Sequence, residues 1–124
     1  MVTGVMTVDD QDRFRAAARD VISATPGFVL AGEASSGSEA IERFAELGPD
    51  LVLMDVRMPG LDGIETTRRL RERHPNAVVV LISLEDVSDM AAATEHCGAA
   101  AFIRKQDLAP RVLTRLWATY GVRS

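Results

Sequence analysis

Short apolar runs alternate with longer segments of helical periodicity along this chain of 124 residues. The runs are short enough to be buried strands, and the segments between them place apolar residues at the spacing of one helix face. This alternation predicts an α/β protein, in which helices connect and cover the strands of a parallel sheet. The carboxyl ends of the strands then share one edge of the sheet, where ligands bind in open α/β folds.

Five strands and five helices are expected, in strict alternation. The strands are expected at Gly4–Val8, Phe28–Ala34, Leu51–Asp55, Ala77–Ile82 and Ala100–Arg104. The helices are expected at Gln11–Ala24, between Ser36 and Gly48, and at about Leu61–Arg73, Val87–His96 and Leu108–Tyr120. Ser36 with Glu39 three residues later predicts a capping box, and Gly98 predicts a left-handed helix stop.

Composition indicates a soluble single domain covering residues 1–124, without a separate output domain. Apolar residues make up 47% of the chain and charged residues 26%, as in globular proteins. The net charge of −4 argues against a nucleic-acid surface. No apolar stretch has the length of a membrane span, and no signal peptide opens the chain. The single cysteine, Cys97, fits a reducing compartment, so a cytoplasmic location is expected.

Charged and hydroxyl side chains follow four of the five expected strands. Asp9 and Asp10 follow the first, Asp55 ends the third, Ser83 follows the fourth and Lys105 follows the fifth. Three neighbouring carboxylates repel one another unless a cation is bound, and oxygen ligands of this kind suit Mg²⁺. A lysine and a hydroxyl group can both bind phosphoryl oxygens. The set therefore predicts phosphoryl transfer with a carboxylate as the nucleophile.

A series of short motifs, in order and at the right spacing, resembles the receiver domain of two-component response regulators over nearly the whole chain. The matching residues are Val8-Asp9-Asp10, Ala34-Ser35-Ser36-Gly37, Pro49 to Asp55, Met58-Pro59-Gly60, Asp62-Gly63, Ser83, Gly98-Ala99 and Lys105. The stretch from Pro49 to Gly63 is most similar to receivers that precede LuxR-type DNA-binding domains. The resemblance implies a doubly wound, flavodoxin-like (βα)5 fold with a five-stranded parallel sheet in the order 2-1-3-4-5.

The resemblance also implies a role for each residue at the sheet edge. A sensor histidine kinase or a phosphotransfer protein would donate a phosphoryl group to Asp55. Mg²⁺ would be held by Asp10, Asp55 and the backbone carbonyl of Arg57, with Asp9 acting mainly through a metal-bound water. Lys105 would hold the incoming phosphoryl group and then pair with the phosphoaspartate.

Ser83 and Phe102 are the expected switch residues of such a receiver. Ser83 would move toward the phosphate, and Phe102 would turn inward to fill the vacated space. The output surface would be the fourth helix, fifth strand and fifth helix. A downstream protein effector is the expected partner and a homodimer is compatible, whereas direct nucleic-acid or membrane binding is not expected. The product would be a changed surface, so the domain is not expected to be an enzyme that releases a metabolite.

Two positions, Gln106 and Leu84, depart from the usual receiver pattern, and two variable positions flank the site. Lys105 is followed by Gln106, where many receivers have a cis proline, so a trans bond is expected here. Leu84 stands where receivers usually have a small residue, and its side chain could crowd the approach to the site or point away. Arg57 and Glu85 flank the site, and we hypothesise that they pair across its mouth and shield an acyl phosphate from water.

Other interpretations of the same residues remain open. Asp9 and Asp10 could cap the helix that follows them, Phe102 could be plain core, and Trp117 could close the core or anchor an interface. The whole domain could be a binding module that signals without phosphorylation. A phosphohydrolase of the haloacid dehalogenase type is a further alternative, but such enzymes need a carboxylate two residues after the nucleophile, and Arg57 occupies that position.

Overall fold

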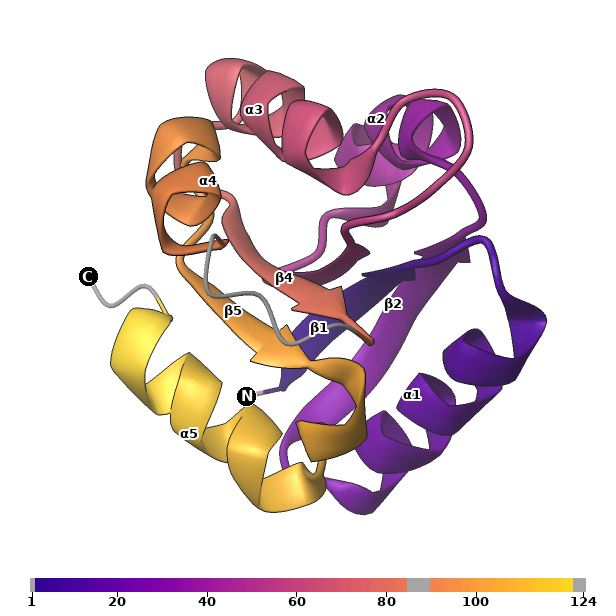
Figure 1. Ribbon diagram of the computed structural model, residues 1–124. Helices are drawn as coiled ribbons and strands as arrows, with labels where there is room; N and C mark the ends of the chain where they lie inside the picture. The colour runs from indigo at the N-terminus through magenta and orange to yellow at the C-terminus, as the bar shows by residue number, and fades with distance from the viewer. Residues whose placement is uncertain (1, 85–89, 122–124) are drawn as a thin grey trace.

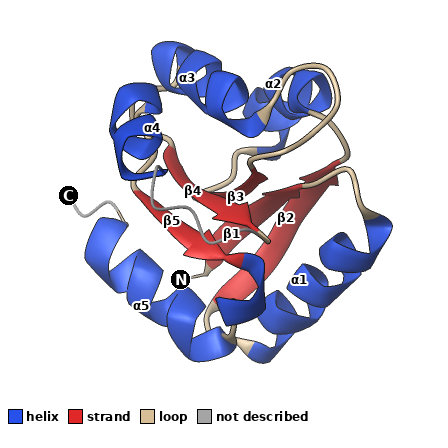
Figure 2. Ribbon diagram, in the orientation of Figure 1, coloured by secondary structure: helices blue, strands red, loops and turns tan. Residues whose placement is uncertain are grey.

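A central sheet lies between two layers of helices in the computed structural model, which describes residues 2–84 and 90–121. Helices α1 and α5 cover one face of the sheet, and α2, α3 and α4 cover the other (Figures 1 and 2). The strands are β1 (Thr3–Val8), β2 (Phe28–Ala34), β3 (Leu51–Asp55), β4 (Val78–Ser83) and β5 (Ala101–Arg104). The helices are α1 (Asp12–Ala24), α2 (Gly37–Leu47), α3 (Gly63–Arg73), α4 (Met90–Cys97), the 3₁₀ turn η1 (Lys105–Asp107) and α5 (Pro110–Tyr120).

The five strands pair in the order β2-β1-β3-β4-β5, and every pairing is parallel. The predicted doubly wound fold and its strand order are therefore confirmed. Asp55 lies opposite Ile82, and Ser83 lies opposite Arg104. The strands consequently end together, and the residues that follow them lie along one edge of the sheet.

Each central strand contributes to two separate cores because its side chains alternate between the faces of the sheet. Leu51 and Leu53 of β3 pack beneath α1 and α5, whereas Val52 and Met54 pack beneath α2, α3 and α4. Every residue of β3 and β4 is buried. These strands are covered on both faces, as their continuous apolar sequences predict.

The helix termini follow the predicted capping signals, with one difference. Ser36 caps α2 by accepting a hydrogen bond from the Glu39 backbone N–H at 3.1 Å. The Glu39 carboxylate accepts the backbone N–H and hydroxyl of Ser35 instead of completing the capping box on Ser36. Gly48 and Gly98 end their helices at φ 55° and 84°, in the left-handed region that glycine adopts without strain.

Several element boundaries differ from the predicted ones by one or two residues. Helix α3 begins at Gly63 because Asp62 serves as its N-cap. Helix α5 begins at Pro110 instead of Leu108, since the chain first forms η1 directly after β5. The predicted start of the fourth helix near Val87 lies outside the described residues. Among the described helices, none has the length and apolar character needed to cross a membrane.

Candidate functional site

The alternation of the strands directs three charged side chains to the same side of the sheet. Leu53 and Ile103 pack beneath α1 and α5, and Asp55 and Lys105 each follow two residues later. Asp9 continues the same phase beyond β1, whose Val5 belongs to the same core. The sheet edge therefore brings the three side chains together on the side of α1 and α5.

Lys105 lies between two carboxylates at this edge. Its Nζ is 2.6 Å from Asp9 Oδ2 and 3.6 Å from Asp55 Oδ1. All three residues are buried, with exposures of 0% for Asp9, 5% for Asp55 and 8% for Lys105. The contact with Asp9 is an ion pair with poor hydrogen-bond direction, because Oδ2 has no hydrogen-bond partner among the described residues. The ammonium group also lies 4.6 Å from the centre of the Phe14 ring, a cation–π contact.

Three carboxylates form a cluster beside this lysine. Oxygens of Asp9, Asp10 and Asp55 all lie within 4.8 Å of one another. Burial raises the pKa of Asp55 from 3.8 to about 6, with the Asp9 carboxylate adding to the rise and the Lys105 ammonium opposing it. An unfavourable buried charge among other carboxylates fits a site for a hard divalent cation, which would relieve the repulsion.

The loop after β1 holds Asp9 by its backbone and its carboxylate. The Asp9 N–H donates to the Ala34 carbonyl at 3.1 Å, and Asp9 Oδ1 accepts the Gln11 N–H at 2.8 Å. Both Asp9 oxygens are thus already engaged, one by Gln11 and one by Lys105. The residue at the N-cap of α1 is Gln11, so the alternative in which Asp9 or Asp10 caps the helix directly is not supported.

The loop after β3 is shaped around Asp55. The backbone N–H of Arg57 donates to the Asp55 carboxylate. The Gly63 N–H donates to the Val56 carbonyl at 2.9 Å, which folds the start of α3 back onto the end of β3. A Cβ atom at Gly63 would stand 2.0 Å from the Asp55 carbonyl oxygen, so only glycine allows this approach.

The two expected switch residues, Ser83 and Phe102, lie on the face of the sheet opposite to that of Asp9, Asp55 and Lys105. Ser83 is buried at the end of β4, and Phe102 is partly buried against the core beneath α2, α3 and α4. Phe102 pairs in register with Leu81, a member of that core. This geometry places both residues on one side of β4 and β5, as a coupled movement requires; their switching role remains a prediction.

The structure describes the two departures from the receiver pattern, whereas one of the two variable flanking residues lies outside the described part of the chain. The Lys105–Gln106 peptide bond is trans, as predicted. The Leu84 side chain is 64% exposed, so it is not packed into the interior over the site. Glu85 lies outside the described residues, and its pairing with Arg57 stays a hypothesis.

Two contacts at the site were not predicted from the sequence. Phe14 belongs to the apolar face of α1, whose spacing indicates plain core, whereas its ring also reaches the Lys105 ammonium. Arg15 donates to the Asp9 carbonyl oxygen. The only sequence signal for either is that both fall in the first turn of the helix after the acidic pair.

The fold and site define an α/β protein with an acidic, cation-type site and a buried lysine at the carboxyl edge of a parallel sheet. The chain belongs to the response regulator receiver domain family, whose pattern matches residues 5–116. Receiver domains are signalling domains of two-component systems and are generally not enzymes in the usual sense. The prediction of a receiver domain is therefore confirmed.

Individual relatives support the same assignment. The chain is 37% identical to the response regulator GacA of Pseudomonas viridiflava over 101 residues, which is 82% of this chain and 47% of GacA. It thus spans about half the length of this relative. A LuxR-family response regulator from Aurantimonas sp. SI85-9A1 is 29% identical with a TM-score of 0.87, covering 100% of this chain and 91% of that one. The CheX–CheY–BeF₃–Mg²⁺ complex from Borrelia burgdorferi matches with a TM-score of 0.86 and 27% identity, covering 98% of this chain and 90% of that chain.

Proposed function

We propose that this receiver accepts a phosphoryl group on Asp55 and thereby switches a protein-interaction surface. The observation that carries the proposal is the position of the Lys105 ammonium, 3.6 Å from Asp55 Oδ1 inside a cluster of three carboxylates. The lysine supplies a fixed positive charge where a transferred phosphoryl group would place its oxygens. The acidic cluster supplies both the nucleophile and the ligands for a cation.

Asp55 is the nucleophile of the proposed reaction. One of its carboxylate oxygens forms a bond to phosphorus while the phosphorus–nitrogen bond of a donor phosphohistidine breaks, and the electron pair of that bond stays on the imidazole. The attack requires the ionised carboxylate. With a pKa of about 6, roughly nine-tenths of Asp55 is ionised at neutral pH. A cation held by the acidic cluster would increase that fraction by opposing the repulsion from Asp9.

Mg²⁺ is the proposed cofactor, and it would neutralise charge that builds up on the phosphoryl oxygens. Asp10, Asp55 and the backbone carbonyl of Arg57 are the proposed ligands. Asp9 is proposed to act through a metal-bound water, which agrees with the engagement of both its oxygens by Gln11 and Lys105. The related CheX–CheY–BeF₃–Mg²⁺ complex of Borrelia burgdorferi includes Mg²⁺, in support of this assignment.

The Lys105 ammonium group is positioned beside Asp55 before the reaction by two neighbouring side chains. Asp9 and the ring of Phe14 keep the ammonium group beside Asp55. After transfer, the phosphoryl oxygens carry more charge than the original carboxylate, and Lys105 pairs with them. The Ser83 hydroxyl then donates a hydrogen bond to another phosphoryl oxygen. The Phe102 side chain turns inward into the space that Ser83 has vacated. The output surface formed by α4, β5 and α5 changes as a result.

The proposed partners follow from the transfer of the phosphoryl group to Asp55 and from the change of surface that results. A sensor histidine kinase or phosphotransfer protein donates the phosphoryl group, and a downstream protein reads the altered surface. A homodimer formed through the same surface, or through α1 and α5, is compatible with the fold. The proposed setting is the cytoplasm.

Intact mass spectrometry tests the proposal. The protein is incubated with acetyl phosphate and Mg²⁺, beside a sample with a chelator and beside the Asp55→Asn variant. A gain of one phosphoryl group in the wild-type protein, lost with the chelator and in Asp55→Asn, is expected. If the wild-type protein gains no phosphoryl group from acetyl phosphate or from a phosphorylated histidine donor domain, the domain is instead a module that signals without phosphorylation.

A further inference from the structure

Arg15 connects the acidic site to the second strand of the sheet. Its Nη1 donates to the Asp9 carbonyl oxygen at 2.5 Å, and its Nε lies 3.4 Å from Glu33 Oε1 on β2. Its other terminal nitrogen pairs with Asp12 in the same turn of α1. The side chain is only 15% exposed although it carries a charge. One largely buried guanidinium therefore ties together the β1–α1 loop, α1 and β2.

The Asp9 carbonyl belongs to the peptide group that joins Asp9 to Asp10. The Asp10 carboxylate is exposed, and no hydrogen bond or ion pair joins it to any other residue that the structure describes. Among the described residues, it is therefore the backbone that sets the position of this carboxylate in the acidic cluster. Since Arg15 fixes the plane of the preceding peptide group, it also limits where the Asp10 carboxylate can point.

Glu33 is itself fixed and charged, so it can hold Arg15 in turn. Arg19 binds it with two hydrogen bonds, from Nε at 2.7 Å and from Nη2 at 3.1 Å. The hydrogen bond from Arg19 lowers the pKa of Glu33, which keeps the carboxylate ionised at neutral pH. The Arg43 side chain donates to the Glu33 carbonyl at 2.6 Å and holds the same position of β2. Arg15 thus bridges the multiply hydrogen-bonded Glu33 of β2 and the loop that carries Asp10.

We propose that Arg15 is a positioning residue for the cation site, which orients the Asp10 carboxylate by holding the Asp9 carbonyl oxygen. The proposal rests on the proposed function only in taking Asp10 and Asp55 as cation ligands. Residues that orient ligands without touching the metal commonly change metal affinity by about 10-fold or more when they are replaced. Loss of the Arg15 contact removes one restraint on the Asp9–Asp10 peptide group, beside the hydrogen bond from the Gln11 N–H to Asp9 Oδ1, and the ordering then needed opposes cation binding.

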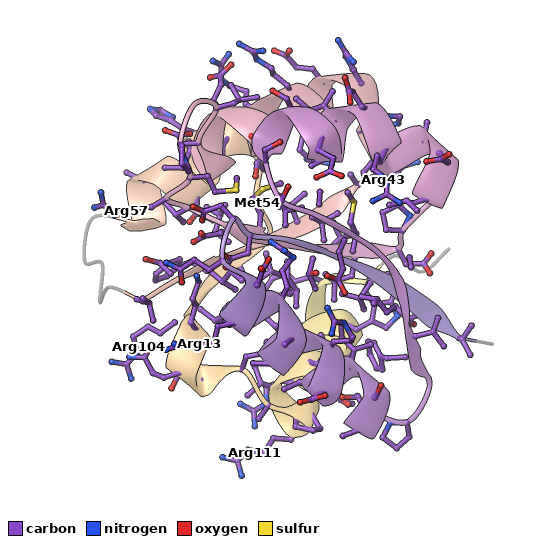
Figure 3. The ribbon with its side chains drawn as sticks, turned by 90° about the vertical axis from the view of Figure 1, so that its right-hand side faces the viewer. Arg13, Arg43, Met54, Arg57, Arg104 and Arg111 are labelled. Carbon is purple, nitrogen blue, oxygen red and sulfur yellow. The ribbon has the colours of Figure 1, made fainter. Side chains whose placement is uncertain are left out.

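Electrostatics alone makes the opposite prediction. A guanidinium bonded to the backbone of Asp9 adds positive charge next to the acidic cluster, which repels an incoming cation, so removal of that charge should strengthen cation binding. The two explanations therefore differ in the sign of the effect. Arg13 provides a matched control because it is exposed on the same helix, and Figure 3 places it at the same end of the molecule as Arg57 and Arg104.

The test measures the dissociation constant for Mn²⁺ from the electron paramagnetic resonance signal of the free ion. Mn²⁺ is used because it shares the oxygen ligands of Mg²⁺ and is paramagnetic. Wild type, Arg15→Ala, Arg15→Lys, Arg13→Ala and Asp10→Ala are compared, with urea unfolding to confirm that each variant is folded. Arg15→Ala is expected to bind Mn²⁺ about 10-fold more weakly than wild type. Arg15→Lys is expected to lie in between, because an ammonium group cannot make the forked contacts of a guanidinium.

Arg13→Ala is expected to bind Mn²⁺ as well as wild type or more tightly. Wild-type or tighter binding by Arg15→Ala would overturn the proposal. If Arg15→Ala does not fold, Arg15→Lys takes its place, and wild-type binding by that variant would overturn the proposal equally. Mn²⁺ binding that does not depend on Asp10 would also overturn it. Failure of Asp55 to accept a phosphoryl group, with the Arg15 effect intact, would instead refute the proposed function and leave the positioning role standing.

Discussion

Replacement of Asp55 by Asn is predicted to stabilise the cation-free protein at alkaline pH. Burial raises the pKa of Asp55 from 3.8 to about 6. The folded protein therefore binds this proton more tightly than the unfolded chain, and the free energy of unfolding falls as pH rises between the two values. A shift of about 2 pH units corresponds to about 3 kcal/mol. This stability is present at low pH and is lost once pH passes the folded-state pKa.

The Asn side chain has nearly the same shape but carries no charge, so it removes the pH-dependent penalty. Urea unfolding without divalent cations should show Asp55→Asn to be more stable than wild type by about 3 kcal/mol near pH 8. The matching rise in melting temperature is about 10 °C for a domain of this size. Near pH 4 the wild-type carboxyl group is largely protonated in the folded state, so the difference should nearly vanish. Mg²⁺ at pH 8 should narrow the gap because it binds the folded wild-type site.

Asp20→Asn is the control, since Asp20 is an exposed carboxylate on α1 away from the cluster. It should change stability little at either pH. An equal gain for Asp55→Asn at both pH values would show that the effect does not come from the buried charge. Destabilisation near pH 8 would contradict the reasoning outright, because it would mean that the site stabilises the carboxylate as it stands.

Substitutions at three further positions test the surroundings of the site. Gly63→Ala should lower stability by about 3 kcal/mol, since its Cβ would stand 2.0 Å from the Asp55 carbonyl oxygen; an unchanged urea midpoint would show that the loop adapts. Phe14→Leu should slow phosphorylation by acetyl phosphate several-fold and Phe14→Tyr should not, because only an aromatic ring retains the cation–π contact with Lys105; equal rates for the two variants would exclude that role. Leu84→Ala should be phosphorylated by acetyl phosphate at a rate within about twofold of wild type, because the Leu84 side chain is 64% exposed. A large acceleration would show that Leu84 crowds the site.

The architecture could be predicted because it depends on patterns that a strand carries in its own sequence. The apolar run Leu51–Asp55 is short, buried on both faces and closed by a carboxylate, and the structure places it in the centre of the sheet. Side chains alternate between the two faces of a sheet along each strand, so the sequence also predicts which residues at the strand ends lie on the same face. Asp55 follows Leu53 by two residues, so both face α1 and α5. The strand order, by contrast, is implied by the family resemblance and not by any single strand.

The remaining features depend on the reach of long side chains between elements, which no local pattern specifies. Arg15 is three residues from Asp12 and could form a simple pair within the helix, yet it also reaches Glu33 and the Asp9 carbonyl. The 3₁₀ turn that begins at Lys105 is likewise not predicted by the sequence, and it delays the start of α5. Its short length and the absence of a side-chain cap leave little signal in the sequence.

The central claim is that Asp55 itself carries the phosphoryl group. Sodium borohydride tests it most directly, because it reduces an acyl phosphate to the alcohol and releases phosphate, which converts the modified aspartate into homoserine. Peptide mapping after treatment with acetyl phosphate, Mg²⁺ and borohydride should find homoserine at position 55. Homoserine at Asp9 or Asp10, or none in a protein that has gained a phosphoryl group, would contradict the assignment of Asp55 as the acceptor.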